Sequence, residues 1–145
     1  MSGTYVPKPE WLVLDWHRAC LAAEALTVQR CDACGAWRHP PRRFCAECAS
    51  PASSFEPVAG TGTVRSLAVS HRSLDPAWHA EVPFATLVVE LDEGPRVLAA
   101  TKTAPGDVGI GTAVRCSVER RSEDFALVWA QPASETTTTT DTTEG

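Results

Sequence analysis

Two Cys-x-x-Cys pairs constrain the fold of this chain more than any other feature. They lie in the stretch CDACGAWRHPPRRFCAEC, residues 31–48, and ten residues separate them. Four thiolates from two such pairs can close a tetrahedral shell around Zn²⁺, with Zn–S bonds of about 2.3 Å. Four cysteine ligands leave no open position for water, so such a metal stabilises a segment too short to build its own core. The spacing predicts a structural zinc site with ligands Cys31, Cys34, Cys45 and Cys48.

The residue after each pair bears on how well each turn suits a metal site. Gly35 follows the first pair and supplies the positive φ that such a turn favours, whereas Ala49 follows the second. A left-handed residue with a Cβ costs about 1–2 kcal/mol, which zinc binding, on the order of 10 kcal/mol, can offset. The alternatives are cysteine pairs without metal, or a disulfide. A redox role would need a single pair beside a βαβ unit, and the sequence contains no such pattern.

Composition and charge limit the cellular compartment and the classes of binding partner that can be expected. The 145 residues suffice for one ordinary domain or two very small ones. Thirteen basic and 18 acidic side chains give a net charge of −5, so the whole molecule has no general attraction to nucleic acid or to an anionic membrane. The polar N-terminus resembles no secretory signal, and no apolar run is long enough to span a membrane. We therefore expect a cytoplasmic protein, where such cysteines bind metal more often than they form disulfides.

A helix is predicted over residues 10–26, which contain no Gly or Pro and follow Pro9. This helix carries more apolar side chains than the single stripe that a surface helix needs. Two explanations remain open: the additional side chains pack on other parts of this chain, or they dock on another protein. The partner-binding candidates are Trp11, Leu14, Trp16 and Leu21.

Residues 61–131 read as five strands joined by tight turns, including a hairpin that turns near Asp92–Gly94. No helical pattern interrupts them. We therefore expect a mainly β protein that ends in a five-stranded OB-like antiparallel barrel, with an SH3-like barrel or a small sandwich as alternatives. The expected organisation is an N-terminal arm and helix (1–27), a zinc ribbon (28–50), a linker (51–60), an OB-fold barrel (61–132) and a disordered acidic tail (133–145).

Three arginines lie between the cysteine pairs of this acidic chain. Arg38, Arg42 and Arg43 could bind phosphate groups, either of a nucleotide-bearing cofactor such as CoA or of nucleic acid. They could equally form a solvated loop or pair with carboxylates of a partner.

The remaining reactive side chains form no catalytic constellation. Cys20 falls on the apolar helix face and Cys116 in a strand, where both are expected to be small core residues. His71, Asp75 and His79 lie in a turn-like loop, but no motif places a nucleophile beside them. We therefore expect no enzyme activity of the chain alone; a thioesterase using this histidine loop is the alternative.

The order of helix, four-cysteine ribbon and OB-like barrel resembles the family of rubredoxin-like zinc-ribbon plus OB-fold proteins that accompany acyl-CoA enzymes. The stretches that carry the resemblance are VQRCDACGAWRHPPRRFCAEC (28–48), GTGTV (60–64), VPFATLVVELDEGPRVLA (82–99) and IGTAV (110–114).

The resemblance implies a non-catalytic accessory subunit that binds and stabilises a thiolase-superfamily enzyme. Such a partner would be a thiolase or a lipid-transfer-protein-like aldolase that cleaves steroid side chains, in a two-plus-two hetero-oligomer. The subunit would help to form the acyl-CoA site at the interface, while the partner performs the chemistry. The alternative is a nucleic-acid-binding zinc-ribbon and OB-fold module. The acidic charge and the scattered aromatic residues of the barrel count against it.

Overall fold

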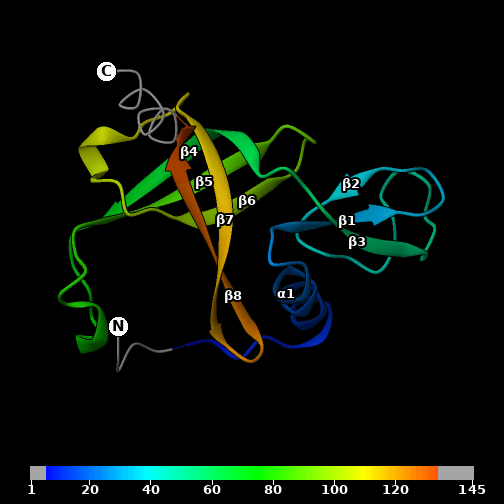
Figure 1. Ribbon diagram of the computed structural model, residues 1–145, viewed down its shortest axis with the longest axis horizontal. Coiled ribbons are helices and arrows are strands. Elements are labelled where there is room, and N and C mark those ends of the chain that lie inside the picture. The colour runs from blue at the N-terminus through cyan, green and yellow to red at the C-terminus, as the bar shows by residue number, and fades with distance from the viewer. Residues whose placement is uncertain (1–5, 134–145) are drawn as a thin grey trace, which may run out of the picture.

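The computed structural model describes residues 6–133, in which one helix lies between a small sheet and a barrel (Figure 1). The helix contacts strands of both assemblies. Helix α1 spans Trp11–Ala23, and the small antiparallel sheet has the order β2 (Trp37–Arg38), β1 (Thr27–Cys31), β3 (Ser53–Pro57). The barrel contains β4 (Thr61–Ser70), β5 (Phe84–Leu91), β6 (Arg96–Ala100), β7 (Ala113–Ser122) and β8 (Phe125–Pro132), with 3₁₀ turns η1 (Pro76–Trp78) and η2 (Pro105–Asp107). The mainly β architecture with a closed five-stranded, OB-like barrel is confirmed.

Helix α1 ends three residues earlier than the sequence predicted. Glu24 takes the left-handed conformation (φ 53°), and Ala25 N donates to the carbonyl oxygen of Cys20 at 3.3 Å. This turn stops the helix and releases Leu26 into the core, where its side chain is fully buried. Ala25 and Leu26 therefore lead into β1 instead of extending the helix.

The segment expected to be a linker contains a strand. β3 pairs antiparallel with β1 over five residue pairs, from Thr27↔Pro57 to Cys31↔Ser53. Its Ser- and Pro-rich sequence hides this role, because β propensity depends on the neighbouring strand more than on the residue. The ribbon sheet thus continues to Pro57, and the link to β4 is short.

The barrel closes in the order β4-β5-β6-β8-β7, with β4 paired to both β5 and β7. A register shift between Val64 and Ser66 increases the local twist where β4 passes from one neighbour to the other. Gly62 is required there, since a Cβ at this position would overlap the carbonyl oxygen of Glu90 and lie 2.8 Å from Val89 Cγ1. The GTGTV stretch thus allows the first barrel strand to pack closely on the second.

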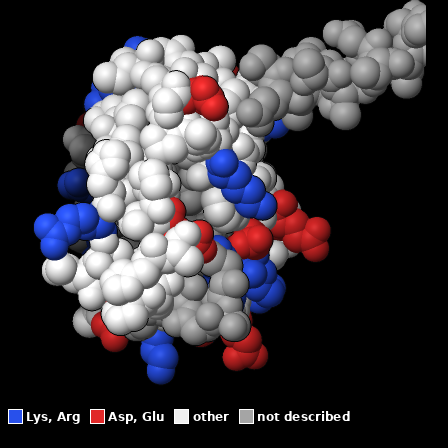
Figure 2. Space-filling view, turned by 90° about the vertical axis from the view of Figure 1, so that its left-hand side faces the viewer, with Lys and Arg blue, Asp and Glu red and all other residues white. Residues whose placement is uncertain are grey.

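A single hydrophobic core joins the ribbon to the barrel. Trp16 and Cys20 of α1 and Val28 of β1 belong to the same buried cluster as the barrel interior. On the surface, Figure 2 shows basic and acidic side chains mixed along one side of the visible face, beside a broad area without charged residues. The predicted acidic tail, apart from Ala133, lies outside the described residues. Within the described part of the chain, no helix is long and apolar enough to cross a membrane.

Candidate functional site

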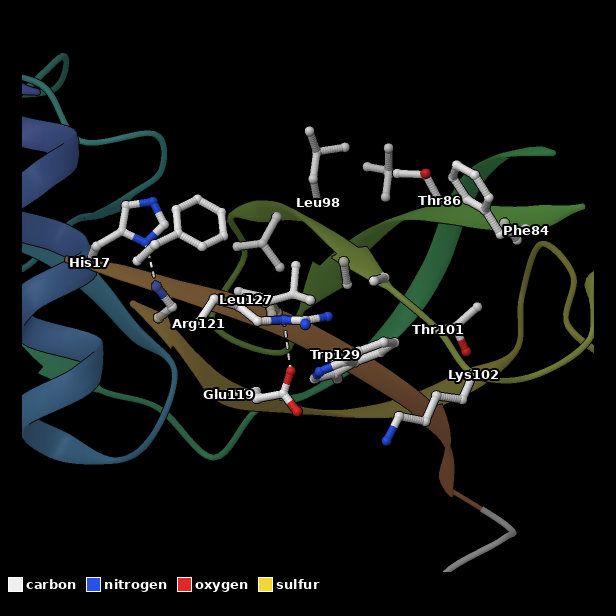
Figure 3. A pocket seen from close by; sticks show the side chains of 18 of the residues that line it. His17, Phe84, Thr86, Leu98, Thr101, Lys102, Glu119, Arg121, Leu127 and Trp129 are labelled. Atoms are coloured by element: carbon white, nitrogen blue, oxygen red, sulfur yellow. Dashed lines mark hydrogen bonds and ion pairs between the residues drawn. The ribbon is translucent and has the colours of Figure 1, made fainter. Parts of the chain in front are cut away.

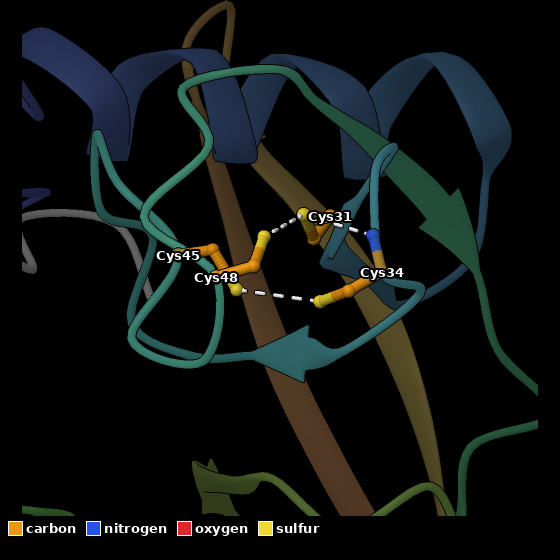
Figure 4. A group of neighbouring side chains, drawn as sticks. All are labelled: Cys31, Cys34, Cys45 and Cys48. Atoms are coloured by element: carbon orange, nitrogen blue, oxygen red, sulfur yellow. Dashed lines mark hydrogen bonds between the residues drawn. The ribbon is translucent and has the colours of Figure 1, made fainter.

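The four predicted zinc ligands converge on one point of the ribbon (Figure 4). All four Sγ atoms lie within 4.8 Å of one another, and Cys31–Cys48 and Cys34–Cys45 are each 3.6 Å apart. A tetrahedral Zn²⁺ with bonds of about 2.3 Å requires sulfur–sulfur separations of about 3.8 Å. The donor set and its geometry therefore fit zinc, with each Cys-x-x-Cys pair contributing half of the shell.

The two cysteine turns have the same backbone geometry. Gly35 N donates to the Cys31 carbonyl at 2.9 Å, and Ala49 N donates to the Cys45 carbonyl at 2.8 Å. Both Gly35 (φ 80°) and Ala49 (φ 64°) are left-handed, as the sequence predicted. The second turn therefore carries the conformational cost of a Cβ that the first avoids.

Backbone N–H groups inside each turn stabilise thiolates. Cys34 N lies 3.5 Å from Cys31 Sγ, and Glu47 N lies 3.4 Å from Cys45 Sγ. The backbone hydrogen bond from Cys34 lowers the pKa of the Cys31 thiol to about 6, and the bond from Cys48 lowers the pKa of Cys45. Contacts between the sulfur atoms raise the pKa of the other two thiols, Cys34 and Cys48. Because a metal binds the thiolate form, Cys31 and Cys45 are the two cysteines whose backbone contacts favour a cation.

The three arginines between the cysteine pairs differ in exposure. Arg38 is half-buried and donates from Nη2 to the carbonyl oxygen of Arg42 at 3.0 Å, while its Nε and Nη1 are enclosed. Arg42 and Arg43 are exposed. Of the predicted phosphate-binding set, these two present their charge to the surface.

The four partner-binding candidates on α1 do not share one environment. Trp16 is buried, and its Nε1 donates to the carbonyl oxygen of Thr27 at 2.8 Å. Leu21 packs against the core, and Leu14 is half-buried. Trp11 alone is strongly exposed, at 76%. Trp16 therefore faces its own chain, because its indole completes the junction between helix and sheet.

His17 is a polar residue that lies on the buried face of the helix. Its Nδ1 accepts a hydrogen bond from Ala126 N of β8 at 3.0 Å. Burial lowers the pKa of His17, so the ring is neutral. The sequence contained a signal for this placement, since His17 lies three residues before Cys20 and beside Trp16, on the same helix face.

Asp75 and His79 of the histidine loop make contacts within the loop itself. Asp75 Oδ1 accepts from Ala77 N at 2.9 Å and caps η1, and His79 Nε2 lies 3.1 Å from the Ser73 carbonyl oxygen. His71 is exposed. Asp75 therefore stabilises the η1 turn and does not orient a histidine ring.

The two cysteines outside the ribbon are buried, as predicted. Burial raises the pKa of both the Cys20 and the Cys116 thiol, in the second case to about 11. Both therefore stay protonated at neutral pH and act as small core residues.

A groove of about 870 Å³ extends along β5, β6 and β8 towards α1 (Figure 3). Its labelled side chains include Leu98 and Leu127 along the length, His17 at one end and Lys102 beside Trp129 at the other. Sequence reasoning missed this site, because its walls come from strands that become neighbours only when the barrel closes.

Two family models match most of the described chain. "ChsH2, rubredoxin-like zinc ribbon domain" matches residues 21–54, and "ChsH2, C-terminal OB-fold domain" matches residues 55–119. The boundary between them follows Ser54, inside the strand that was expected to be a linker.

Two relatives of known description align with much of this chain. A probable enoyl-CoA hydratase alpha subunit of Thermomonospora curvata is 40% identical over 74% of this chain. The 3-oxo-4,17-pregnadiene-20-carboxyl-CoA hydratase alpha subunit of Mycobacterium tuberculosis is 38% identical over 66% of it. The chain spans only about a third of the length of these curated relatives, 34% and 30%.

A solved structure matches over a larger share. In a structure described as an Ltp2–ChsH2(DUF35) aldolase, one chain superposes with a TM-score of 0.76 and 31% identity, over 88% of this chain and 99% of that one. Both the ribbon and the barrel are thus shared along nearly the whole of a relative. The chain therefore belongs to the ChsH2-like family, which joins a rubredoxin-like zinc ribbon to an OB-fold.

Proposed function

We propose that this chain is a non-catalytic accessory subunit of an acyl-CoA enzyme of the thiolase superfamily, a thiolase or a steroid side-chain-cleaving aldolase. The observation that carries the proposal is the similarity over 99% of a chain from the Ltp2–ChsH2(DUF35) aldolase. The hydratase alpha subunits among its relatives also act on CoA thioesters, according to their names. In this proposal the zinc ribbon and barrel stabilise the partner enzyme and help to form its acyl-CoA site.

The chemistry of the described residues supports a binding role. A closed four-cysteine metal site has no position for substrate, and both remaining cysteines are buried thiols. In the histidine loop, Asp75 caps η1 and His79 contacts the Ser73 carbonyl oxygen. The carbon–carbon bond chemistry would therefore belong to the partner.

A docking surface is available where α1 meets the ribbon loop. We call it the helix–ribbon patch, defined by Trp11, Val13, Arg43 and Phe44. Trp11 and Phe44 are 76% and 61% exposed, and Trp11, Val13 and Arg43 line a shared depression. Trp11 also holds a left-handed backbone (φ 61°), a cost that structures usually bear for a function. Aromatic side chains beside an arginine are typical of interface hot spots.

Co-expression with the thiolase-like or aldolase-like protein encoded nearest to this chain tests the proposal. A stable complex is expected by size-exclusion chromatography with light scattering, and a mass of two copies of each chain would support the two-plus-two assembly. The partner should lose solubility or activity without this subunit. A chain that stays monomeric beside every such enzyme, or that binds single-stranded DNA at micromolar concentration in low salt, would contradict the proposal.

The docking surface has its own test. The double variant Trp11→Ser and Phe44→Ser should weaken the complex by several hundredfold or more, because hot-spot residues contribute about 2 kcal/mol or more each, about 30-fold for one residue. Leu74→Ser is the matched control, since Leu74 is also an exposed apolar residue but lies outside the patch. A complex that tolerates the double variant would place the interface elsewhere on the chain.

A further inference from the structure

The barrel has an open seam between β6 and β8. These two parallel strands share a single register pair, Ala100↔Trp129, whereas the neighbouring strand pairs share five or more. Residues that line the groove include Val97 and Ala99 of β6, together with Ala126 and Val128 of β8. These four side chains are buried members of the barrel core. The groove is therefore a slot that passes between two strands and reaches the barrel interior.

The outer wall of the slot is largely apolar, with Thr86 and Arg96 as polar members, although it lies on the outside of the barrel. Outward-facing positions on a strand normally carry polar residues. Here they carry Leu98, which is 66% exposed, together with Val88 and Leu127. Helix α1 reaches only the end marked by His17 (Figure 3). Strands two and three of an OB barrel, here β5 and β6, form the face on which this fold usually binds ligands.

One end of the slot carries unpaired polar groups. Lys102 Nζ lies 5.0 Å from the centre of the Trp129 ring and makes no ion pair among the described residues. The other two cations of the lining, Arg96 and Arg121, are paired with carboxylates, Arg121 with Glu119 at 2.8 Å. Trp129 Nε1 is buried without an acceptor. A free ammonium and a free N–H therefore lie at the same end.

We propose that this slot binds a small apolar molecule that ends in one carboxylate or carbonyl group. Its apolar body would lie along Leu98 and Leu127, and its terminal oxygen would accept from Trp129 Nε1 beside the ammonium of Lys102. An acceptor there satisfies a buried donor that otherwise costs free energy. A volume of about 870 Å³ with few convergent polar groups is typical of small-molecule sites. A peptide fits less well, since its own backbone groups would need partners above an apolar floor.

This binding belongs to the chain itself and does not depend on the proposed partner enzyme. The test therefore uses the full zinc-loaded chain alone, with three ligands built on a ten-carbon chain: decanoate, methyl decanoate and decylamine, all below micelle-forming concentrations. In titration calorimetry, decanoate should bind with the highest affinity, methyl decanoate with a lower affinity and decylamine with the lowest. Of the five indole N–H signals in the nuclear magnetic resonance spectrum, that of Trp129 should shift with decanoate and with the ester.

Matched variants separate the two ends of the slot. Lys102→Met should weaken decanoate about threefold to fivefold, the scale of an exposed ion pair, and leave methyl decanoate unchanged. Leu98→Glu should weaken both ligands at least tenfold, whereas Leu74→Glu, an exposed leucine outside the slot, should change neither. Circular dichroism and zinc content establish that each variant is folded. The proposal is overturned if neither decanoate nor its ester binds, if decylamine binds as tightly as decanoate, or if folded Leu98→Glu binds like the wild type.

Discussion

His17 Nδ1 accepts a hydrogen bond from Ala126 N at 3.0 Å, and this bond connects residues 109 positions apart in the sequence. The imidazole also stacks on Phe125, with ring centroids 4.5 Å apart. β8 has only one register pair with β6, at Ala100↔Trp129. Helix α1 therefore supplies, through one side chain, a hydrogen-bond acceptor for a strand that the neighbouring β6 leaves unpaired at this point.

Replacing His17 with Phe should destabilise the chain by about 1–3 kcal/mol. Phe keeps an aromatic ring on Phe125 but leaves the buried Ala126 N–H without an acceptor, which is the costly outcome. Urea unfolding followed by circular dichroism measures the change. Arg18→Ala is the matched control, since Arg18 pairs with Asp124 at 3.0 Å with side chains 58% and 45% exposed. The control should cost at most about 1 kcal/mol. Equal losses for both variants would contradict the role of His17.

Because of His39, the free energy of unfolding should decrease as the pH is lowered from about 6.5 to 4. Burial, and secondarily the nearby His17, lowers the pKa of His39 to about 4. Between pH 6.5 and 4, His39 therefore binds a proton in the unfolded chain but not in the folded chain. This stabilisation of the folded chain is fully present above pH 6.5 and is lost as the pH falls towards 4. The loss is on the order of 1–3 kcal/mol.

His39→Leu provides the comparison for this pH dependence. Cysteine protonation weakens zinc binding at low pH in both proteins, so only the difference between their unfolding free energies reports on His39. The variant should gain stability relative to the wild type as pH falls from 6.5 to 4. Parallel pH profiles would show that His39 titrates normally in the folded chain.

The local cysteine pattern predicted the four-cysteine cluster, while contacts between distant parts of the chain could not be predicted. Cys31, Cys34, Cys45 and Cys48 come together as candidate metal ligands because each pair lies in one short turn. The sequence could not reveal that β3 completes the ribbon sheet, since Ser53–Pro57 becomes a strand only against β1. Trp16 looked available for docking because helix periodicity does not say which surface a second element will cover. The groove depends on β6 and β8 meeting in parallel, which no local pattern encodes.

Cys45→Ser should abolish stoichiometric zinc binding. A serine hydroxyl is not deprotonated at neutral pH, so one corner of the four-sulfur shell would be lost. The barrel should stay mostly folded, because most residues of the shared core come from its own strands. Elemental analysis of the purified variant, together with its circular dichroism spectrum, measures both outcomes. Zinc content equal to that of the wild type would contradict the four-thiolate assignment. Cys116→Ser, which removes a thiol outside the ribbon, should retain the metal.

Gly62→Ala should destabilise the barrel by more than about 2 kcal/mol. Its Cβ would overlap the Glu90 carbonyl oxygen, a backbone atom of the paired strand that cannot move without disturbing the β4–β5 ladder. Gly106→Ala is the control, since no heavy atom lies within 4 Å of a Cβ there and its φ is not positive. That variant should stay within about 1 kcal/mol of the wild type, on either side. Thermal unfolding compares the two; a tolerated Gly62→Ala would show that β4 and β5 lie further apart than described.

Exchanging glycine and alanine after the two cysteine pairs should change the stability of the zinc-bound chain in opposite directions. Ala49→Gly should stabilise the zinc-bound chain, because a left-handed residue (φ 64°) loses its Cβ, although greater freedom of the unfolded chain offsets part of the gain. Gly35→Ala should destabilise the zinc-bound chain by about 1 kcal/mol or more, because the left-handed backbone (φ 80°) is strained for a residue with a Cβ. The new Cβ itself would have space, since its nearest atom would be Arg30 Nη2 at 3.6 Å. Chelator competition on both variants measures the change in zinc affinity.

The two turns have the same hydrogen bond, from Gly35 N to the Cys31 carbonyl oxygen at 2.9 Å and from Ala49 N to the Cys45 carbonyl oxygen at 2.8 Å. The two variants should therefore differ from the wild type only through the Cβ that is added or removed. Changes of the same sign in both variants would refute this equivalence.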